Sequence, residues 1–310
     1  MSPEIKESII RLRAEGKSLR AIAEQLLGAK TKESTVRHIL KKSEEVPMEG
    51  AKILVFDIET SPCKSYHWRR WKENIGQDQA ISESYILTWA AKWLGQDGII
   101  SDTIVNYDKY LEDSEDDSSV LLSLVRLIDE ADMVIAHNGK AFDIPVVKAR
   151  MLYHGLQPFS PVRIIDTKII AQKEFRLPSN ALNSIAAYLG LGSKVSTGGF
   201  KLWKGCMDND PEAWELMLTY NEQDVRLLED VYMRLRPFDS RHPNVALYSD
   251  CSVTRCPCCG SEDLYQEEKF DSTNVSMFPV VRCNNCGKPS STRQSVLNKD
   301  QRKTILRNTR

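Results

Sequence analysis

The stretch Ile53-Leu54-Val55-Phe56-Asp57-Ile58-Glu59-Thr60 determines how the rest of the chain is interpreted. Its four consecutive apolar residues are typical of a strand that is buried on both faces, as in the middle of an α/β sheet. Because strand side chains alternate between the two faces, Asp57 and Glu59 must point the same way. Two such carboxylates repel each other and lose hydration. This arrangement is costly unless a cation lies between them. Oxygen ligands of this kind suit Mg²⁺ or Mn²⁺ rather than zinc, and a solvated pair is the alternative for the two acids taken alone.

Further acidic residues follow the same pattern of buried strands and helix starts. Residues 132–139 form a second apolar run that closes in a turn, and Asp143 then comes near the start of a helix. Residues 211–236 carry apolar side chains at helical spacing. On this helix Tyr220 and Asp224 are four residues apart and share a face. We expect the four acids and the tyrosine to converge at one point.

These residues resemble the motifs of the DEDD superfamily of 3′-to-5′ exonucleases, an RNase H-like group that includes the proofreading domains of DNA polymerases. Asp57-x-Glu59 resembles the first motif, Asn138-x-x-x-Phe142-Asp143 the second, and Tyr220-x-x-x-Asp224 the third motif of the tyrosine subgroup. The stretch 198–203 and the cysteine-rich tail are similar to those of stand-alone predicted exonucleases of phages and bacteria. The resemblance implies an α/β fold, with an RNase H-like mixed five-stranded sheet flanked by helices.

The resemblance also implies roles for the motif residues in a reaction that uses two Mg²⁺ or Mn²⁺ ions. Asp57 would bridge both ions, Glu59 and Asp224 would complete the site that holds the attacking water, and Asp143 would contribute to the second site. A tyrosine with an ordinary pKa near 10 is a poor general base at neutral pH. The Tyr220 hydroxyl is therefore expected to orient the water by hydrogen bonding.

Other polar residues near the predicted strand ends are given structural roles. His137 is an alternative base, but a packed, hydrogen-bonded histidine is the favoured interpretation. Asp166 ends a predicted strand over 162–166 and is expected to support or cap its neighbours. The acidic run over 112–117 is predicted to be a solvated loop before a helix over 118–130.

The composition is that of an ordinary globular protein with room for two or three domains: 310 residues, 41% hydrophobic and 27% charged. The net charge of −1 hides an excess of +3 over residues 1–45 and of +6 over residues 287–310, which suits a polyanionic partner. The sequence shows neither a long apolar run nor the apolar core of a signal peptide, so we expect no membrane span and a cytoplasmic, intracellular location.

The domain boundaries are predicted from the helical patterns and the linker composition. Residues 1–45 resemble a helix-turn-helix whose third helix would place Arg37 and Lys41 toward DNA, and a protein-docking module is the alternative. Residues 46–50 are the predicted linker, residues 51–240 the exonuclease domain, and residues 250–310 a zinc ribbon with a basic tail.

Several segments are candidates for binding the substrate strand. Aromatic and basic residues alternate over 66–72 and suit a single-strand track, while a packed connection with core tryptophans is the alternative. The stretch 194–204 is a predicted loop that either clamps the substrate or covers the site without contacts. The residues predicted to contact nucleic acid are Asn138, Phe142, Trp68, Arg69, Arg70, Trp71, Lys201, Trp203, Arg37 and Lys41.

Two Cys-x-x-Cys pairs near the C-terminus, Cys256/Cys259 and Cys283/Cys286, predict one structural zinc site. The pattern resembles a zinc ribbon, and an iron–sulfur centre is the alternative. Cys258 falls between two ligands and is expected to be a spectator.

The predicted function is hydrolysis of DNA from the 3′ end, in proofreading or repair during phage or bacterial replication, with a DNA polymerase or another replication protein as a possible partner. An RNA 3′-to-5′ exonuclease is the nearest alternative. A nucleic-acid-binding regulatory protein that keeps the nuclease fold as a scaffold is the second.

Overall fold

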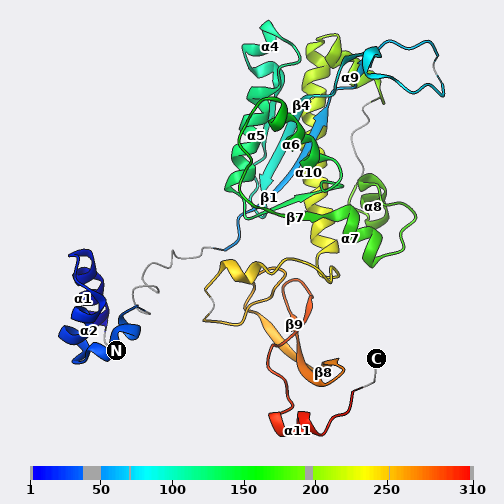
Figure 1. The fold of residues 1–310 in the computed structure, drawn as a ribbon. Helices are drawn as coiled ribbons and strands as arrows, with labels where there is room; N and C mark the ends of the chain where they lie inside the picture. The colour runs from blue at the N-terminus through cyan, green and yellow to red at the C-terminus, as the bar shows by residue number, and fades with distance from the viewer. Residues whose placement is uncertain (1–2, 38–49, 70, 193–197, 251, 308–310) are drawn as a thin grey trace. The chain divides into compact units, whose positions relative to one another are not determined.

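The computed structural model describes residues 3–37, 50–69, 71–192, 198–250 and 252–307 (Figure 1). The chain divides into two units: Met1–Gly50 with Tyr248–Asp250, and Ala51–Leu247 with Cys251–Arg310. Each unit has its own apolar core, and the two are described separately below.

The first unit begins with two helices, α1 (Pro3–Ala14) and α2 (Leu19–Leu27). The Ser18 hydroxyl caps α2 by accepting from the Ala21 amide at 3.2 Å. A 3-10 turn, η1 (Lys30–Lys32), leads into helical residues 33–37. The second half of the predicted third helix, including Lys41, lies outside the described residues. The fully buried or nearly buried apolar side chains of this unit are Ile9, Leu12, Ile22, Ala23 and Val36.

The second unit is built on a mixed five-stranded sheet in the order β5-β4-β1-β6-β7. Its strands are β1 (Ile53–Thr60), β4 (Ile86–Trp93), β5 (Ile100–Thr103), β6 (Met133–Ala136) and β7 (Arg163–Asp166). The central strand β1 pairs antiparallel with β4, where Asp57 lies opposite Ala90, and parallel with β6, where Val55 lies opposite Ile135. The predicted α/β fold class is confirmed, and the stretch Ile53–Thr60 forms the central strand of the sheet.

Helices cover both faces of this sheet (Figure 1). On one face lies α10 (Pro211–Leu235), and on the other lie α5 (Ser118–Glu130) and α6 (Asp143–Tyr153). The alternation of side chains along β4 shows this directly. Thr88 donates to Asn221 of α10, whereas the next residue, Trp89, donates from its indole nitrogen to the Val120 carbonyl of α5 at 2.9 Å. Side chains at odd positions of β1, including Asp57, therefore face α10.

Shorter helices complete the second unit: η3 (Ile104–Asn106), α4 (Lys109–Glu112), α7 (Thr167–Glu174), α8 (Leu182–Leu189) and α9 (Lys201–Met207). The prediction of a loop over 194–204 is wrong from Lys201 onward, because α9 begins there. Leu202 and Cys206 of this helix are buried, and the helix packs closely on α10, where a Cβ at Gly205 would lie 2.6 Å from the Ala213 Cβ. Within the described residues, the structure has no helix that is long and apolar enough to cross a membrane.

The acidic run before α5 is not entirely solvated. Asp117 is fully buried, and its carboxylate accepts from the Ile86 amide at 2.8 Å. The Arg150 guanidinium donates to the same carboxylate from two nitrogens, at 2.7 to 3.1 Å, and His154 Nε2 lies 2.6 Å from it. The prediction of a solvated loop is wrong for Asp117, because its partners come from another strand and helix.

Replacing Arg150 by alanine is expected to lower the free energy of unfolding by about 3 kcal/mol, because it removes the guanidinium from the buried Asp117 carboxylate and leaves His154 as its basic partner. Urea denaturation of the full chain measures this change. Arg126→Ala, which removes an exposed arginine of α5, is the matched control and should stay within about 0.5 kcal/mol of wild type. Equal effects of the two substitutions would contradict a structural role for the pair.

The C-terminal part of this unit is a three-stranded sheet in the order β10-β9-β8, followed by α11 (Lys299–Lys303). Its strands are β8 (Leu264–Thr273), β9 (Ser276–Cys283) and β10 (Pro289–Ser291). It is attached to the end of α10. Cys258 Sγ lies 3.6 Å from the Arg236 carbonyl, and Lys288 Nζ donates to the Asp239 carbonyl at 2.6 Å. Cys258 thus has a packing role in joining this sheet to α10.

Candidate metal sites and nucleic-acid contacts

Three carboxylates meet where β1 passes under α10. Asp57 and Glu59 lie on the same face of β1, and Asp224 lies on the helix that covers this face. One oxygen from each residue can be chosen so that all three lie within 4.8 Å of one another. Asp224 is buried, while Asp57 and Glu59 are half-buried. Three of the four predicted acids are therefore brought together.

The chemistry of this group fits a divalent cation. Three negative charges this close in a partly buried setting repel one another, and each loses hydration. Carboxylate oxygens are the ligands that Mg²⁺ and Mn²⁺ prefer. A cation held by Asp57, Glu59 and Asp224 would relieve both costs.

Asp143 lies at the same end of β1 but outside this group of three. Its Oδ1 accepts from the Ile58 amide at 3.3 Å. Strand β6 pairs with β1 only as far as Val55, so this carboxylate takes an amide that lies beyond the paired stretch. Burial raises the pKa of Asp143 to about 7, and the negative charge of Asp166 acts in the same direction. The carboxylate is thus held next to the Asp57-x-Glu59 pair, in a setting where burial disfavours its charged form.

The turn that begins at Asn138, the first residue of the second motif, is held by hydrogen bonds to Asp166 at the end of β7. This carboxylate accepts from the Asn138 amide at 3.1 Å and from the Lys140 amide at 3.0 Å, and it also caps the start of α7. Asn138 has a positive φ of 71°. At Gly139 a Cβ would lie 2.4 Å from the Ala136 Cβ, so a larger residue would clash there. The predicted supporting role of Asp166 is confirmed.

His137 is the packed, hydrogen-bonded histidine that the sequence favoured. Its Nδ1 lies 2.9 Å from the Thr167 hydroxyl, and its Nε2 lies 3.0 Å from the Asn180 carbonyl. Because a carbonyl only accepts, Nε2 carries the proton. Both ring nitrogens are therefore engaged in holding β6 to the neighbouring segments.

Tyr220 lies one helical turn before Asp224 on α10. The Trp203 ring meets it edge to face, with ring centroids 6.2 Å apart. Trp203, a predicted nucleic-acid contact, is partly buried and packs against the main apolar core. Lys201, the first residue of α9, is exposed, and so in part is Phe142 at the start of α6.

Sequence reasoning missed Asn221, the residue after Tyr220. It is fully buried, and its Nδ2 donates to Asp57 Oδ2 at 2.8 Å and to the Asp57 carbonyl at 3.3 Å. One signal was present in the sequence. Asn221 occupies a position of the inward stripe of α10, between Met217 and Asp224, and a polar residue there needs a buried partner.

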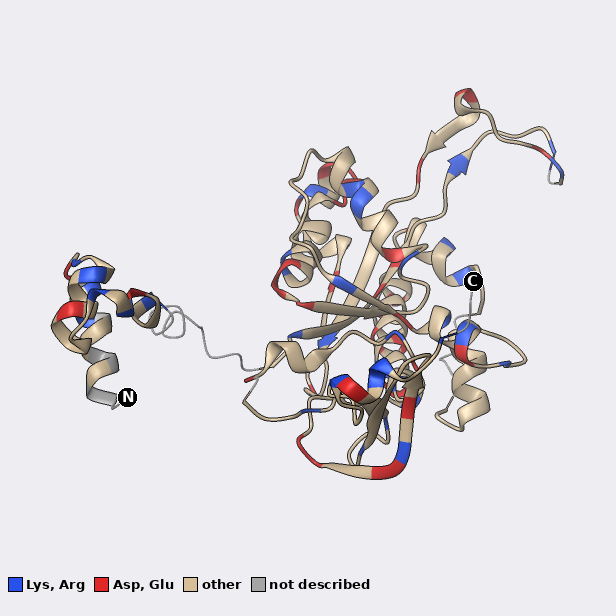
Figure 2. Ribbon diagram, turned by 60° about the horizontal axis from the view of Figure 1, so that its bottom comes forward, with Lys and Arg blue, Asp and Glu red and all other residues tan. Residues whose placement is uncertain are grey.

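Aromatic residues gather on a small arm formed by β2 (Lys64–Ser65) and β3 (Ala80–Ser82), which projects from the rest of the unit (Figures 1 and 2). Trp68 is 93% exposed and Trp71 is 83% exposed. The alternative that these tryptophans are core residues is therefore wrong. The Glu73 carboxylate orders the loop by accepting from the amides of Trp68 at 3.1 Å and Arg69 at 2.6 Å. Arg70 lies outside the described residues.

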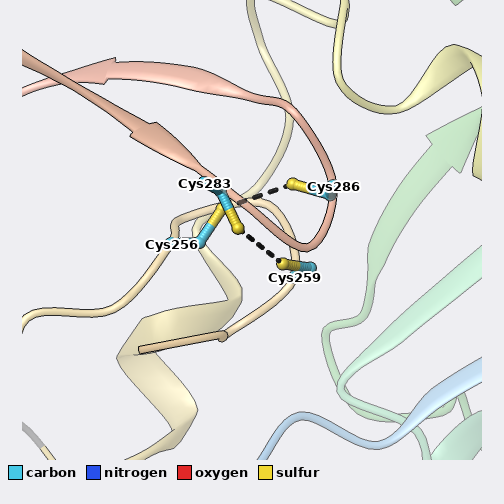
Figure 3. Close-up of side chains that lie close together, drawn as sticks. All are labelled: Cys256, Cys259, Cys283 and Cys286. Carbon is cyan, nitrogen blue, oxygen red and sulfur yellow. Dashed lines mark hydrogen bonds between the residues drawn. The ribbon is translucent and has the colours of Figure 1, made fainter. Parts of the chain in front are cut away.

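Four cysteine sulfurs point toward one another, two from the loop before β8 and two from the end of β9 and the turn that follows it (Figure 3). The Sγ atoms of Cys256 and Cys286 are 3.6 Å apart, as are those of Cys259 and Cys283. A tetrahedral zinc ion with bonds of about 2.3 Å would place its sulfurs roughly 3.8 Å apart. The four thiols fit such an ion closely, and the three-stranded sheet is the scaffold that holds them.

Comparisons with known proteins agree with the fold. Residues 87–236, just under half of the chain, match a family model described as the RNase_H superfamily. This match begins in β4 and ends directly after α10, so it contains Asp143, Tyr220 and Asp224 but not β1.

A solved structure with similarity to the chain is the family B DNA polymerase from the hyperthermophilic archaeon Pyrobaculum calidifontis. The sequence identity is 16% and the TM-score is 0.44. The similarity covers 60% of this chain but only 25% of the polymerase, so the chain spans about a quarter of that protein's length. The sequence matches no curated protein.

Proposed function

We propose that the chain is a metal-dependent 3′-to-5′ exonuclease that hydrolyses phosphodiester bonds of DNA. The observation that carries this proposal is the meeting of Asp57, Glu59 and Asp224 within 4.8 Å, on an RNase H-like sheet. The family match over residues 87–236 supports a nuclease in particular.

The proposed chemistry needs two divalent ions, Mg²⁺ or Mn²⁺. When bound, such ions lower the pKa of an attacking water and neutralise the charge on the leaving 3′ oxygen. Asp57, Glu59 and Asp224 would hold one ion. Asp57 and Asp143 would hold the other, since Asp143 is fixed at the same end of β1. The Tyr220 hydroxyl would orient the attacking water, because an ordinary phenol keeps its proton at neutral pH.

A substrate strand would be bound partly by the β2–β3 arm. Its exposed tryptophans offer faces on which unpaired bases stack. Arg69, between the two tryptophans, and Lys72, directly after Trp71, would offer charge to the phosphates. Because both rings are exposed, these tryptophans are not core residues of a packed connection. Lys201, Asn138 and Phe142 would provide further contacts within this unit, and Arg37 would contact DNA from the first unit.

Replacing Trp68 and Trp71 together by alanine is expected to weaken binding of a single-stranded oligonucleotide by at least about tenfold, because each stacked base contributes about 1–3 kcal/mol. Fluorescence anisotropy of the zinc-loaded chain with a labelled oligonucleotide, in buffer without Mg²⁺ or Mn²⁺, measures this without cleavage. The control is Tyr188→Ala, which removes an exposed ring of α8. Unchanged affinity in the double variant would remove the arm from the substrate path.

Digestion of end-labelled substrates tests the proposed activity. Single and double strands of DNA and RNA, labelled at the 3′ or the 5′ end, are incubated with and without Mg²⁺. The proposal expects a ladder of shortened 5′-labelled DNA only when the metal is present. Faster digestion of matched RNA would support the RNA exonuclease instead. Tight binding with no metal-dependent cleavage, in wild type as in Asp57→Ala, would favour the regulatory protein with a scaffold fold.

The flanking parts would hold or recruit the substrate. The first unit carries basic residues on its helices, and we propose that it contacts DNA as a helix-turn-helix (Figure 2). The four cysteines would bind one structural zinc, and the basic tail beyond them would offer a second surface for nucleic acid or a replication protein such as a polymerase. A cytoplasmic role in phage or bacterial replication suits these partners.

A further inference from the structure

A chain of hydrogen bonds links β4, α10 and β1 and ends on Asp57, one of the three carboxylates. The Thr88 hydroxyl of β4 donates to Asn221 Oδ1 of α10 at 3.2 Å. Asn221 Nδ2 in turn donates to Asp57 of β1, at 2.8 Å to the carboxylate and at 3.3 Å to the main-chain carbonyl. Thr88 and Asn221 are both fully buried.

The orientation of the Asn221 amide is fixed by its partners. The carboxylate and the carbonyl of Asp57 only accept hydrogen bonds, so Nδ2 must face them and Oδ1 must face away. Thr88 then supplies the donor that Oδ1 needs. Turning the amide over would set two oxygens against each other and leave buried groups unpaired, which is costly.

We propose that Asn221 is a positioning residue for the cation site, and that Thr88 acts through it. The inference rests on the proposed function, because it takes Asp57 to be a metal ligand. The amide binds Oδ2 and the main-chain carbonyl of Asp57 and so fixes the orientation of this carboxylate. It also ties the carboxylate to α10, the helix that carries Asp224, so the two acids are held at a fixed separation.

Asn221 can position the Asp57 carboxylate without adding charge to the site. Asn221 is neutral and therefore adds nothing to the repulsion among the three carboxylates. A buried donor next to a metal ligand restrains that ligand before the ion arrives, and loss of such a partner typically lowers metal affinity by about 10–100-fold. A residue that only filled space at this place would not affect the affinity for a cation.

The test measures binding of Mn²⁺ to the zinc-loaded full chain by isothermal titration calorimetry, without nucleic acid. Asn221→Ala is expected to bind Mn²⁺ about 10–100-fold more weakly than wild type. Thr88→Val, which keeps the shape of the side chain and removes the donor, is expected to show a smaller loss of a few-fold. Gln223→Ala, an exposed position of the same helix, is the matched control and should bind as wild type does.

Circular dichroism of each variant shows whether it is folded. A folded Asn221→Ala chain with wild-type affinity for Mn²⁺ would overturn the proposal. If Asn221→Ala does not fold, Thr88→Val decides, and unchanged affinity in that variant overturns the proposal equally. The proposed function fails separately: a wild type that binds Mn²⁺ but cleaves no nucleic acid would refute the nuclease and leave the role of Asn221 intact. A wild type that binds no Mn²⁺ would refute both.

Discussion

Replacing Asp57 or Asp224 by asparagine is expected to slow metal-dependent cleavage of DNA at least about 10³-fold, the equivalent of about 4 kcal/mol in the activation free energy. Each substitution keeps the shape of the side chain but removes one of three charges that lie within 4.8 Å of one another. Asparagine is a weaker ligand than a carboxylate, so the cation site loses both charge and affinity. Single-turnover digestion of a 5′-labelled oligonucleotide in Mg²⁺ measures the rate.

Two further variants show whether the loss belongs to this site. Asp230→Asn changes an exposed acid on the same helix and should leave the rate within about twofold of wild type. Tyr220→Phe should lower the rate and leave binding of Mn²⁺ in place, because a hydroxyl that orients water holds no ion. Full activity in Asp57→Asn would contradict the proposed site, and full activity in Tyr220→Phe would remove the tyrosine from it.

Local periodicity was enough to predict the part of the site that depends on single elements. Alternation along β1 places Asp57 and Glu59 on one face, and the four-residue spacing on α10 places Tyr220 with Asp224. The sequence does not contain the distance between these two elements. That distance comes from the packing of α10 across β1 and β4, which the sequence only implied through the resemblance to known exonucleases.

The residues that sequence reasoning missed or misassigned are those whose partners are far away in the chain. Asn221 bonds to Asp57, 164 positions earlier, and Asp117 bonds to Arg150, 33 positions later. Asp117 looks like part of a solvated acidic run until the fold buries it. Asn221 lies on the inward stripe of α10, but the sequence does not name its partner. A buried polar side chain must find a partner, and that partner is set by tertiary structure rather than by neighbours in sequence.

Packing between elements also decided where the helices and the exposed aromatic residues lie. The segment at Lys201 has the glycines and lysines of a loop, yet it forms α9 because Leu202 and Cys206 are buried. Trp68 and Trp71 are residues that are usually buried, yet both rings are exposed on an arm whose loop is ordered by hydrogen bonds to Glu73. Composition alone could not separate these cases.

Replacing Cys283 by serine is expected to abolish the zinc site and to unfold the three-stranded sheet that carries it. The free energy of binding zinc to a four-thiolate site is on the order of 10 kcal/mol, more than so small a sheet can gain from its own packing. Strand β8 has almost no buried side chains, so little else holds the sheet together. Metal analysis by mass spectrometry should fall from one zinc per chain to none.

The control for this change is Cys63→Ser, which removes an exposed cysteine and should retain the zinc. Limited proteolysis should then cut Cys283→Ser within residues 256–291 while the RNase H-like sheet survives, because that sheet has a separate apolar core. The end of α10 should loosen as well, since Cys258 and Lys288 contact the carbonyls of Arg236 and Asp239 there.

Iron with a visible charge-transfer absorption in place of zinc would support an iron–sulfur centre. A Cys283→Ser chain that keeps its zinc would refute the four-thiolate site, because three thiolates and a serine hydroxyl bind the ion far more weakly than four thiolates.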